Sequence, residues 1–169
     1  MKSTVWQRLD LIARNLLPFS FTILLIMISL LPVRPPDAAP LVPSLALIAV
    51  FFWTIYRPDL MPEWAVFLIG LFQDLMGGGL VGIGILSLLI VQQIVKTQRR
   101  TCINAPFFLV WSIFALVVLG AEAVVWILTC GLHLRLISPM PGIFEGLLTL
   151  AFYPLLAWLF ARMQRLLLR

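Results

Sequence analysis

Long apolar runs, separated by short polar breaks, follow one another along this chain. Of its 169 residues, 62% are apolar and only 11% are charged. A soluble domain is typically about 45–50% apolar and about 25% charged. The composition therefore excludes an ordinary soluble enzyme, a disordered tail and a disulfide scaffold. We predict an all-α polytopic membrane protein whose residues face lipid or pack within a helical bundle.

Six apolar segments are predicted to cross the membrane as one six-helix transmembrane bundle without a separate soluble domain. An amphipathic segment at residues 2–15 precedes them and is expected to lie on the membrane surface. A cleaved signal peptide is the alternative for the first run, but Asp37-Ala38-Ala39 before Pro40 is a poor cleavage context. The spans are expected at about residues 16–31, 41–56, 64–76, 80–95, 107–130 and 143–160.

Residues 64–95 are predicted to form two short helices. A single straight helix of this length would be about 48 Å long, whereas the hydrocarbon core is about 30 Å thick. Glycines also cluster in this region and make a poor helix interior. We therefore expect a glycine-rich turn, recessed below the outer surface, at Gly77, Gly78, Gly79, Gly82 and Gly84.

The distribution of positive charge predicts the orientation of the chain. Lysine and arginine concentrate on the cytoplasmic side of membrane proteins. With six crossings and a cytoplasmic N-terminus, only Arg34 and Arg135 of the twelve lie outside. Both termini are therefore predicted to be cytoplasmic, and the net charge of +5 is attributed to an anionic membrane surface and not to nucleic acid. The cytoplasmic set is Lys2, Arg8, Arg14, Arg57, Lys96, Arg99, Arg100, Arg162, Arg165 and Arg169.

Several polar residues are predicted to lie at membrane depth, where each ionisable side chain costs at least ~2.5–3.5 kcal/mol. The helical rise places Gln73 and Asp74 near mid-membrane. It places Glu122 and Glu145 in the outer half, near Arg135. The functional interpretation is an outward polar pocket lined by these residues. The structural interpretation is that Asp74 caps the glycine turn and Glu122 is protonated or hydrogen-bonded between helices. The sequence leaves both open.

No catalytic or cofactor-binding constellation is evident. His133 is the only histidine and has no evident nucleophile partner, and Asp74 is the only aspartate at membrane depth. No lysine follows Gly79-x-x-Gly82, so a nucleotide-binding loop is not expected. Cys102 and Cys130 with one histidine offer no metal-ligand spacing. We expect no enzyme activity, no metal and no cofactor.

Aromatic and cationic residues near the predicted helix ends are typical of membrane interfaces. The cationic face formed by Arg162, Arg165 and Arg169 is expected to contact anionic lipid or a cytoplasmic partner. The aromatic residues assigned to interfacial belts are Trp53, Tyr56, Trp64, Trp111, Tyr153 and Trp158.

Two stretches resemble the bacterial rod shape-determining protein MreD family. One is the turn Tyr56-Arg57-Pro58-Asp59, and the other is the helix end Gly70-Leu71-Phe72-Gln73-Asp74 before the glycines. Their order and spacing carry the resemblance, although this chain lacks the proline that the family usually has near Leu80. The residues assigned to structural turns and a partner surface are Arg57, Pro58, Asp59, Gly77, Gly78, Gly79 and Gly82.

The resemblance implies a non-enzymatic component of the cell-elongation (rod) complex in the bacterial inner membrane. Such a component supports cell shape and lateral peptidoglycan synthesis by binding partner proteins. The partners implied are the scaffold protein MreC, with MreB, RodA and penicillin-binding protein 2. The family is also similar in fold to the substrate-binding subunits of energy-coupling-factor transporters. A substrate-binding subunit of a vitamin or small-solute transporter is therefore the alternative function.

Each turn is also given a local role. Asp59 and Glu63 are predicted to cap the start of the third helix. Asp74 is predicted to accept hydrogen bonds from backbone amides freed at the glycine break, at the start of the fourth helix.

Overall fold

The computed structural model describes residues 19–29, 42–77, 80–134 and 136–167. Within these ranges the chain is entirely helical and contains no strand. The all-α prediction is confirmed for the described residues, and the predicted amphipathic segment 2–15 lies outside them. The elements are the helix Phe19–Ser29, α2 (Leu45–Tyr56), the 3₁₀ helix η1 (Pro58–Leu60), α3 (Glu63–Gly77), α4 (Ile83–Ile103), α5 (Phe107–His133) and α6 (Met140–Leu167).

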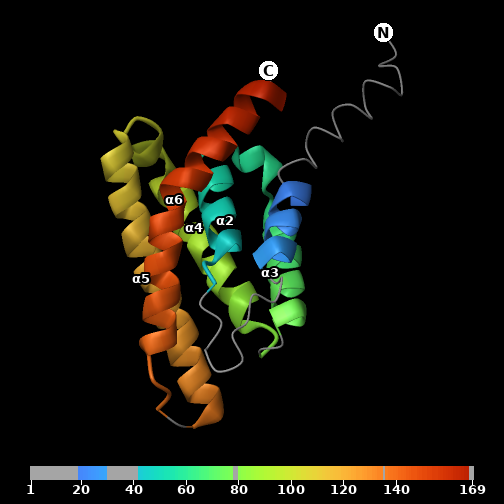
Figure 1. Ribbon diagram of the computed structural model, residues 1–169, viewed down its shortest axis with the longest axis vertical. Coiled ribbons are helices and arrows are strands. Elements are labelled where there is room, and N and C mark those ends of the chain that lie inside the picture. Colours follow the sequence, from blue (N-terminus) through green and yellow to red (C-terminus); the bar gives the residue numbers. More distant parts are fainter. Residues whose placement is uncertain (1–18, 30–41, 78–79, 135, 168–169) are drawn as a thin grey trace, which may run out of the picture.

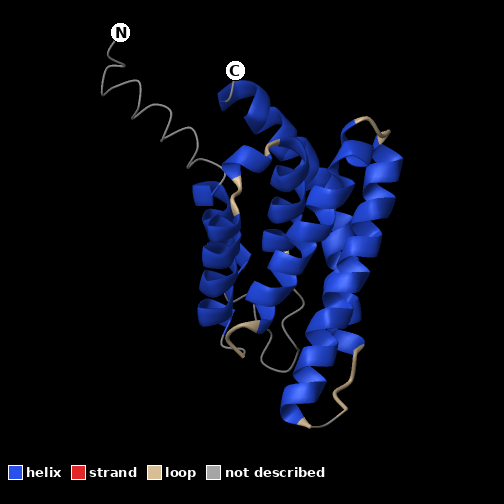
Figure 2. Cartoon of the chain, turned by 180° about the vertical axis from the view of Figure 1, so that it is seen from behind, coloured by secondary structure: helices blue, strands red, loops and turns tan. Residues whose placement is uncertain are grey.

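The helices form a bundle in which successive helices run in opposite directions (Figures 1 and 2). α4 packs against α2, α3 and α5, and α6 packs against α5 and α2. Ten of the twelve residues of α2 are buried. Because α2 is apolar on every side and carries no charge, it suits this surrounded position.

Length separates the helices into two groups. Of the described helices, α5 and α6 are long and apolar enough to span a membrane. The helix Phe19–Ser29 and α2 are shorter apolar helices. In both views the hairpin of α5 and α6 extends beyond the adjacent ends of α3 and α4 (Figures 1 and 2).

The helix boundaries follow local chemistry. α2 ends where Arg57 adopts φ −145°, because a residue before proline is disfavoured in helical geometry. α3 ends at Gly77 and α4 begins after Gly82, which has φ +111°. The glycine-rich segment therefore separates two helices, as predicted. A positive φ of this kind is open to glycine without steric cost.

Two helices extend beyond the predicted spans. α4 continues past residue 95 to Ile103, so Lys96, Arg99 and Arg100 lie within the helix. α6 begins at Met140, before the sixth predicted span at about residue 143, and Pro141 lies in its first turn. Pro141 fits there because the first turn of a helix does not use its backbone N–H groups.

Aromatic rings form the centre of the core, which corrects part of the interfacial assignment. Trp53 and Tyr153 are fully buried and so do not belong to an interfacial belt. The ring of Phe114 lies 4.8 Å from that of Phe51 and 4.2 Å from that of Tyr153. Trp64 and Trp158 are exposed, by 59% and 61%.

Pro154 interrupts the hydrogen bonding of α6. Proline has no backbone N–H, so Pro154 cannot donate to the carbonyl of Leu150. The indole Nε1 of Trp111, on α5, donates to that carbonyl at 3.3 Å. A neighbouring helix thus supplies a donor that the proline removes, as membrane helices require.

Candidate functional site

The carboxylate of Asp74 holds the start of α4. Its Oδ2 accepts hydrogen bonds from the backbone N–H of Gly82 at 2.7 Å and of Ile85 at 3.4 Å. The first N–H groups of a helix have no intrahelical acceptor and carry partial positive charge. The N-cap residue, Gly82, has no side chain to satisfy them. The predicted contact between Asp74 and the freed amides is confirmed.

Two glycines let α3 and α4 approach closely at this point. A Cβ added to Gly84 would overlap Oδ1 of Asp74. A Cβ added to Gly70 would lie 2.8 Å from Cα of Ile85. A Cβ on Gly77 or Gly82 would meet nothing within 4 Å, so these positions do not serve packing. Gly78 and Gly79 lie outside the described residues.

A cavity of about 360 Å³ opens beside Asp74 between the start of α2 and helices α3, α4, α5 and α6. Four of the five residues predicted to form an outward pocket line it: Gln73, Asp74, Glu122 and Glu145. The fifth, Arg135, lies outside the described residues. The wall also includes Ser44, Ser87, Thr129 and His133. We call this space the polar cavity.

Three carboxyl groups and the amide oxygen of Gln73 give the polar cavity many hydrogen-bond acceptors. The side chains of Glu122 and Glu145 form no hydrogen bond or ion pair with any described residue. The buried Oε1 atom of Gln73 also lacks a partner there. Such a wall can receive hydrogen-bond donors. No group of His, Cys, Asp and Glu in the described part of the chain could hold a metal ion.

Small residues on α6 position Glu122, although they were not among the predicted site residues. A Cβ on Gly142 would lie 3.0 Å from Oε2 of Glu122. A Cβ on Gly146 would lie 3.3 Å from a methyl carbon of Val118. The spacing Gly142-x-x-x-Gly146 is the small-residue pattern that allows close helix packing in membranes, and it was readable in the sequence.

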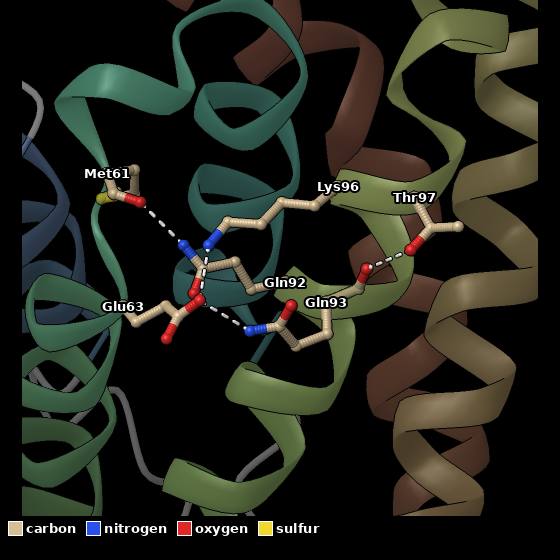
Figure 3. A network of polar contacts seen from close by, with 6 residues as sticks. All are labelled: Met61, Glu63, Gln92, Gln93, Lys96 and Thr97. Carbon is tan, nitrogen blue, oxygen red and sulfur yellow. Dashed lines mark hydrogen bonds and ion pairs between the residues drawn. The ribbon is translucent and has the colours of Figure 1, made fainter.

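Side chains of α4 hold the turn between α2 and α3 at the other end of the bundle. Gln92 is buried, and its Nε2 donates to the carbonyl of Met61 at 2.7 Å (Figure 3). Nε of Arg99 donates to the carbonyl of Ile55 at 2.9 Å. The two donors satisfy backbone carbonyls at the end of α2 and in the turn that follows it, where no further helical N–H is available to bond them. Neither residue was predicted to make these contacts, because no local sequence pattern points to them.

The predicted cap at this turn is not present. Asp59 is exposed and makes no hydrogen bond with the described residues. Glu63 instead accepts hydrogen bonds from Lys96 at 3.0 Å and from Gln93 at 2.8 Å (Figure 3). The hydrogen bonds from Lys96 and Gln93 lower the pKa of the Glu63 carboxyl. Arg57 and Pro58 form the bend as predicted, but α4 anchors it.

A bundle of apolar helices around a polar cavity, with two helices long enough to span a membrane, is the architecture of a helical membrane protein. The model of the rod shape-determining protein MreD family matches residues 10–164 of this chain. The chain therefore belongs to the MreD family, whose members are membrane proteins that determine rod shape.

No curated protein and no solved structure matches the chain. The fold similarity to the substrate-binding subunits of energy-coupling-factor transporters stays a prediction. The family is a shape-determining structural component and not a known family of enzymes.

Proposed function

We propose that this protein is a non-enzymatic integral component of the rod complex in the bacterial inner membrane. It supports cell shape and lateral peptidoglycan synthesis by binding partner proteins, foremost the scaffold protein MreC, with MreB, RodA and penicillin-binding protein 2 in the same complex. The observation that carries this proposal is the family match, which covers nearly the whole chain.

The proposal includes six membrane crossings with both termini in the cytoplasm. The described lysines and arginines support it, because they belong to helix ends that lie with the C-terminus at one end of the bundle (Figure 1). The Asp74 turn and the polar cavity belong to the other end. Positive residues favour the cytoplasmic side. The cationic set is Arg57, Lys96, Arg99, Arg100, Arg162 and Arg165.

On this orientation the polar cavity faces the periplasm. Asp74 fixes the start of α4 and so shapes one wall of the cavity. Unpartnered carboxylates on α5 and α6 form another wall. We propose that a periplasmic segment of the scaffold protein binds this surface with hydrogen-bond donors or cationic side chains, which the acceptor-rich wall favours.

The test is complementation in a rod-shaped bacterium that lacks its own family member, combined with co-purification from mildly solubilised membranes. The wild-type chain should restore rod shape and retain MreC. A Glu122→Gln, Glu145→Gln variant should reach the membrane at the wild-type level but retain less MreC. Glu63→Gln, which removes the charge of a carboxylate outside the cavity, is the matched control. Round cells that contain the inserted wild-type chain would overturn the proposal.

A further inference from the structure

A second cavity lies at the opposite end of the bundle from the polar cavity. It encloses about 750 Å³ between α2, α6 and the start of α5, within the roughly 300–1,000 Å³ of small-molecule pockets. Its walls are mostly aromatic and apolar, from Phe52, Phe107, Tyr153 and Trp158. No acidic residue of the described chain lines it. We call it the α2–α6 groove.

The groove changes from apolar to cationic along its length. On α6 the lining residues Pro154, Ala157, Ala161 and Arg165 follow one helical face. They span about 16 Å at the helical rise of 1.5 Å per residue. On α2, aromatic lining residues are followed directly by Arg57. Because α2 and α6 run in the same direction, both arginines lie at one end of the groove (Figure 1).

Among the described residues, neither the Arg57 nor the Arg165 side chain has a hydrogen-bond or ion-pair partner. Nε of Arg57 is buried and has no hydrogen-bond partner in the described chain. Arg165 is exposed and forms no ion pair with a described residue. A buried guanidinium nitrogen without an acceptor is costly, so the groove favours an anionic group between Arg57 and Arg165.

We propose that the α2–α6 groove binds one anionic phospholipid. The phosphate lies between Arg57 and Arg165, and an acyl chain follows the aromatic wall toward Phe107 and Pro154. A lipid has this same order of charge and hydrocarbon, whereas a free phosphate would leave the apolar wall uncovered. The lipid belongs to the cytoplasmic leaflet, a statement that rests on the proposed topology.

The test measures lipid binding to the purified full-length chain by native mass spectrometry in a zwitterionic detergent. Dioleoyl phosphatidylglycerol should bind more tightly than dioleoyl phosphatidylcholine, which has the same acyl chains and no net charge. Arg57→Gln and Arg165→Gln should each weaken phosphatidylglycerol binding roughly fivefold, which corresponds to about 1 kcal/mol per arginine. Arg100→Gln removes an exposed arginine outside the groove and should have no effect.

A variant that fills the groove distinguishes lipid binding in the groove from general attraction of anionic lipid to the positive charges. Ala161→Trp fills the groove without changing its charge and should weaken binding of both lipids. Equal affinity for the two lipids would overturn the proposal, as would arginine variants that match Arg100→Gln. Displacement of the lipid by millimolar inorganic phosphate would also overturn it. A photo-crosslinker at position 161 would also identify the occupant of the groove. Capture of residues 2–15 would assign the groove to that segment, and capture of another protein would assign it to a partner; either result would overturn the lipid proposal. Because the assay uses purified protein, its failure would leave the cell-shape proposal standing.

Discussion

Single polar residues in this protein complete the hydrogen bonding of backbone groups that helix ends leave unpaired. Asp74 accepts from two amides at the start of α4. Gln92 and Arg99 donate to carbonyls in or near the α2–α3 turn. Within a membrane protein such groups have little access to water, so each bond replaces one that solvent would otherwise provide. The strength of each should depend on its burial and charge.

Asp74→Leu should lower the free energy of unfolding by about 1.5–3 kcal/mol, the range for a hydrogen bond to a charged group. Asp74→Asn keeps an acceptor and should cost less, about 1 kcal/mol. Reversible unfolding in mixed micelles would measure both. Asp59→Leu is the control and should stay within about 0.5 kcal/mol, because Asp59 is exposed and unpartnered. Equal losses for Leu and Asn at position 74 would contradict the proposed backbone contact.

The α2–α3 turn offers a comparison between a buried bond and an exposed ion pair. Gln92→Leu should cost about 1–3 kcal/mol, because it leaves the Met61 carbonyl buried without a donor. Lys96→Met removes an ion pair with the exposed Glu63 and should cost less. Thermal unfolding in detergent would rank the two variants. A larger loss for Lys96→Met would show that the exposed pair, and not Gln92, anchors the turn.

At the scale of whole elements, neighbouring helices pack closely at glycines, and one helix supplies a hydrogen-bond donor that its neighbour lacks. α3 and α4 meet at Gly70, and α5 and α6 meet at Gly146. Trp111 of α5 satisfies a carbonyl that Pro154 frees in α6. In a bilayer the hydrophobic effect gives little attraction between helices, so close approach and hydrogen bonding acquire more weight.

Gly70→Ala should destabilise the protein by about 1–3 kcal/mol, because its Cβ would lie 2.8 Å from backbone Cα of Ile85. Gly120→Ala is the matched control in α5, where a Cβ would meet nothing within 4 Å. That change should be neutral or stabilising by up to about 1 kcal/mol. Unfolding free energies would compare the two. A neutral Gly70→Ala would mean that α3 and α4 do not approach closely.

The pairing of Trp111 with Pro154 can be measured with a double-mutant cycle. Trp111→Phe should cost about 0.5–1.5 kcal/mol in the wild-type chain. Pro154→Ala restores a backbone N–H that can bond the Leu150 carbonyl within α6. In that background Trp111→Phe should cost less, so the two changes should be coupled. If the two changes in unfolding free energy were strictly additive, Trp111 would not compensate for the backbone donor that Pro154 lacks.

At the scale of the molecule, the bundle has two chemically different ends. Unpaired carboxylates line the cavity at one end, and the described lysines and arginines gather at the other (Figure 1). This asymmetry is what a fixed orientation in the membrane requires. It also separates the proposed periplasmic partner surface from the α2–α6 groove.

Reporter fusions would test the orientation. Fusions within residues 96–101 and after residue 169 should both report a cytoplasmic location, because the positive residues cluster near these positions. A fusion in residues 134–138 should report the periplasm and serves as the opposite control. An external signal at either of the first two positions would contradict the six-crossing topology.

Features that depend on local chemistry were predictable from the amino-acid sequence. Long apolar runs predicted an all-helical chain, and the glycine cluster predicted the break between α3 and α4. The contact between Asp74 and Gly82 was predictable because only eight residues separate them. Membrane depth, estimated from helical rise, predicted that Gln73, Glu122 and Glu145 would share one region with Asp74, and all four line the polar cavity.

Which apolar residues face the protein interior depends on how the helices pack against one another. Lipid and protein interior are equally apolar, so hydropathy cannot distinguish the buried Trp53 and Tyr153 from aromatic residues at the interface. Nor does a local pattern reveal that Gln92 reaches Met61, 31 residues away, or that Arg99 reaches Ile55, 44 residues away. Such contacts, like the α2–α6 groove, arise only when helices distant in sequence pack side by side.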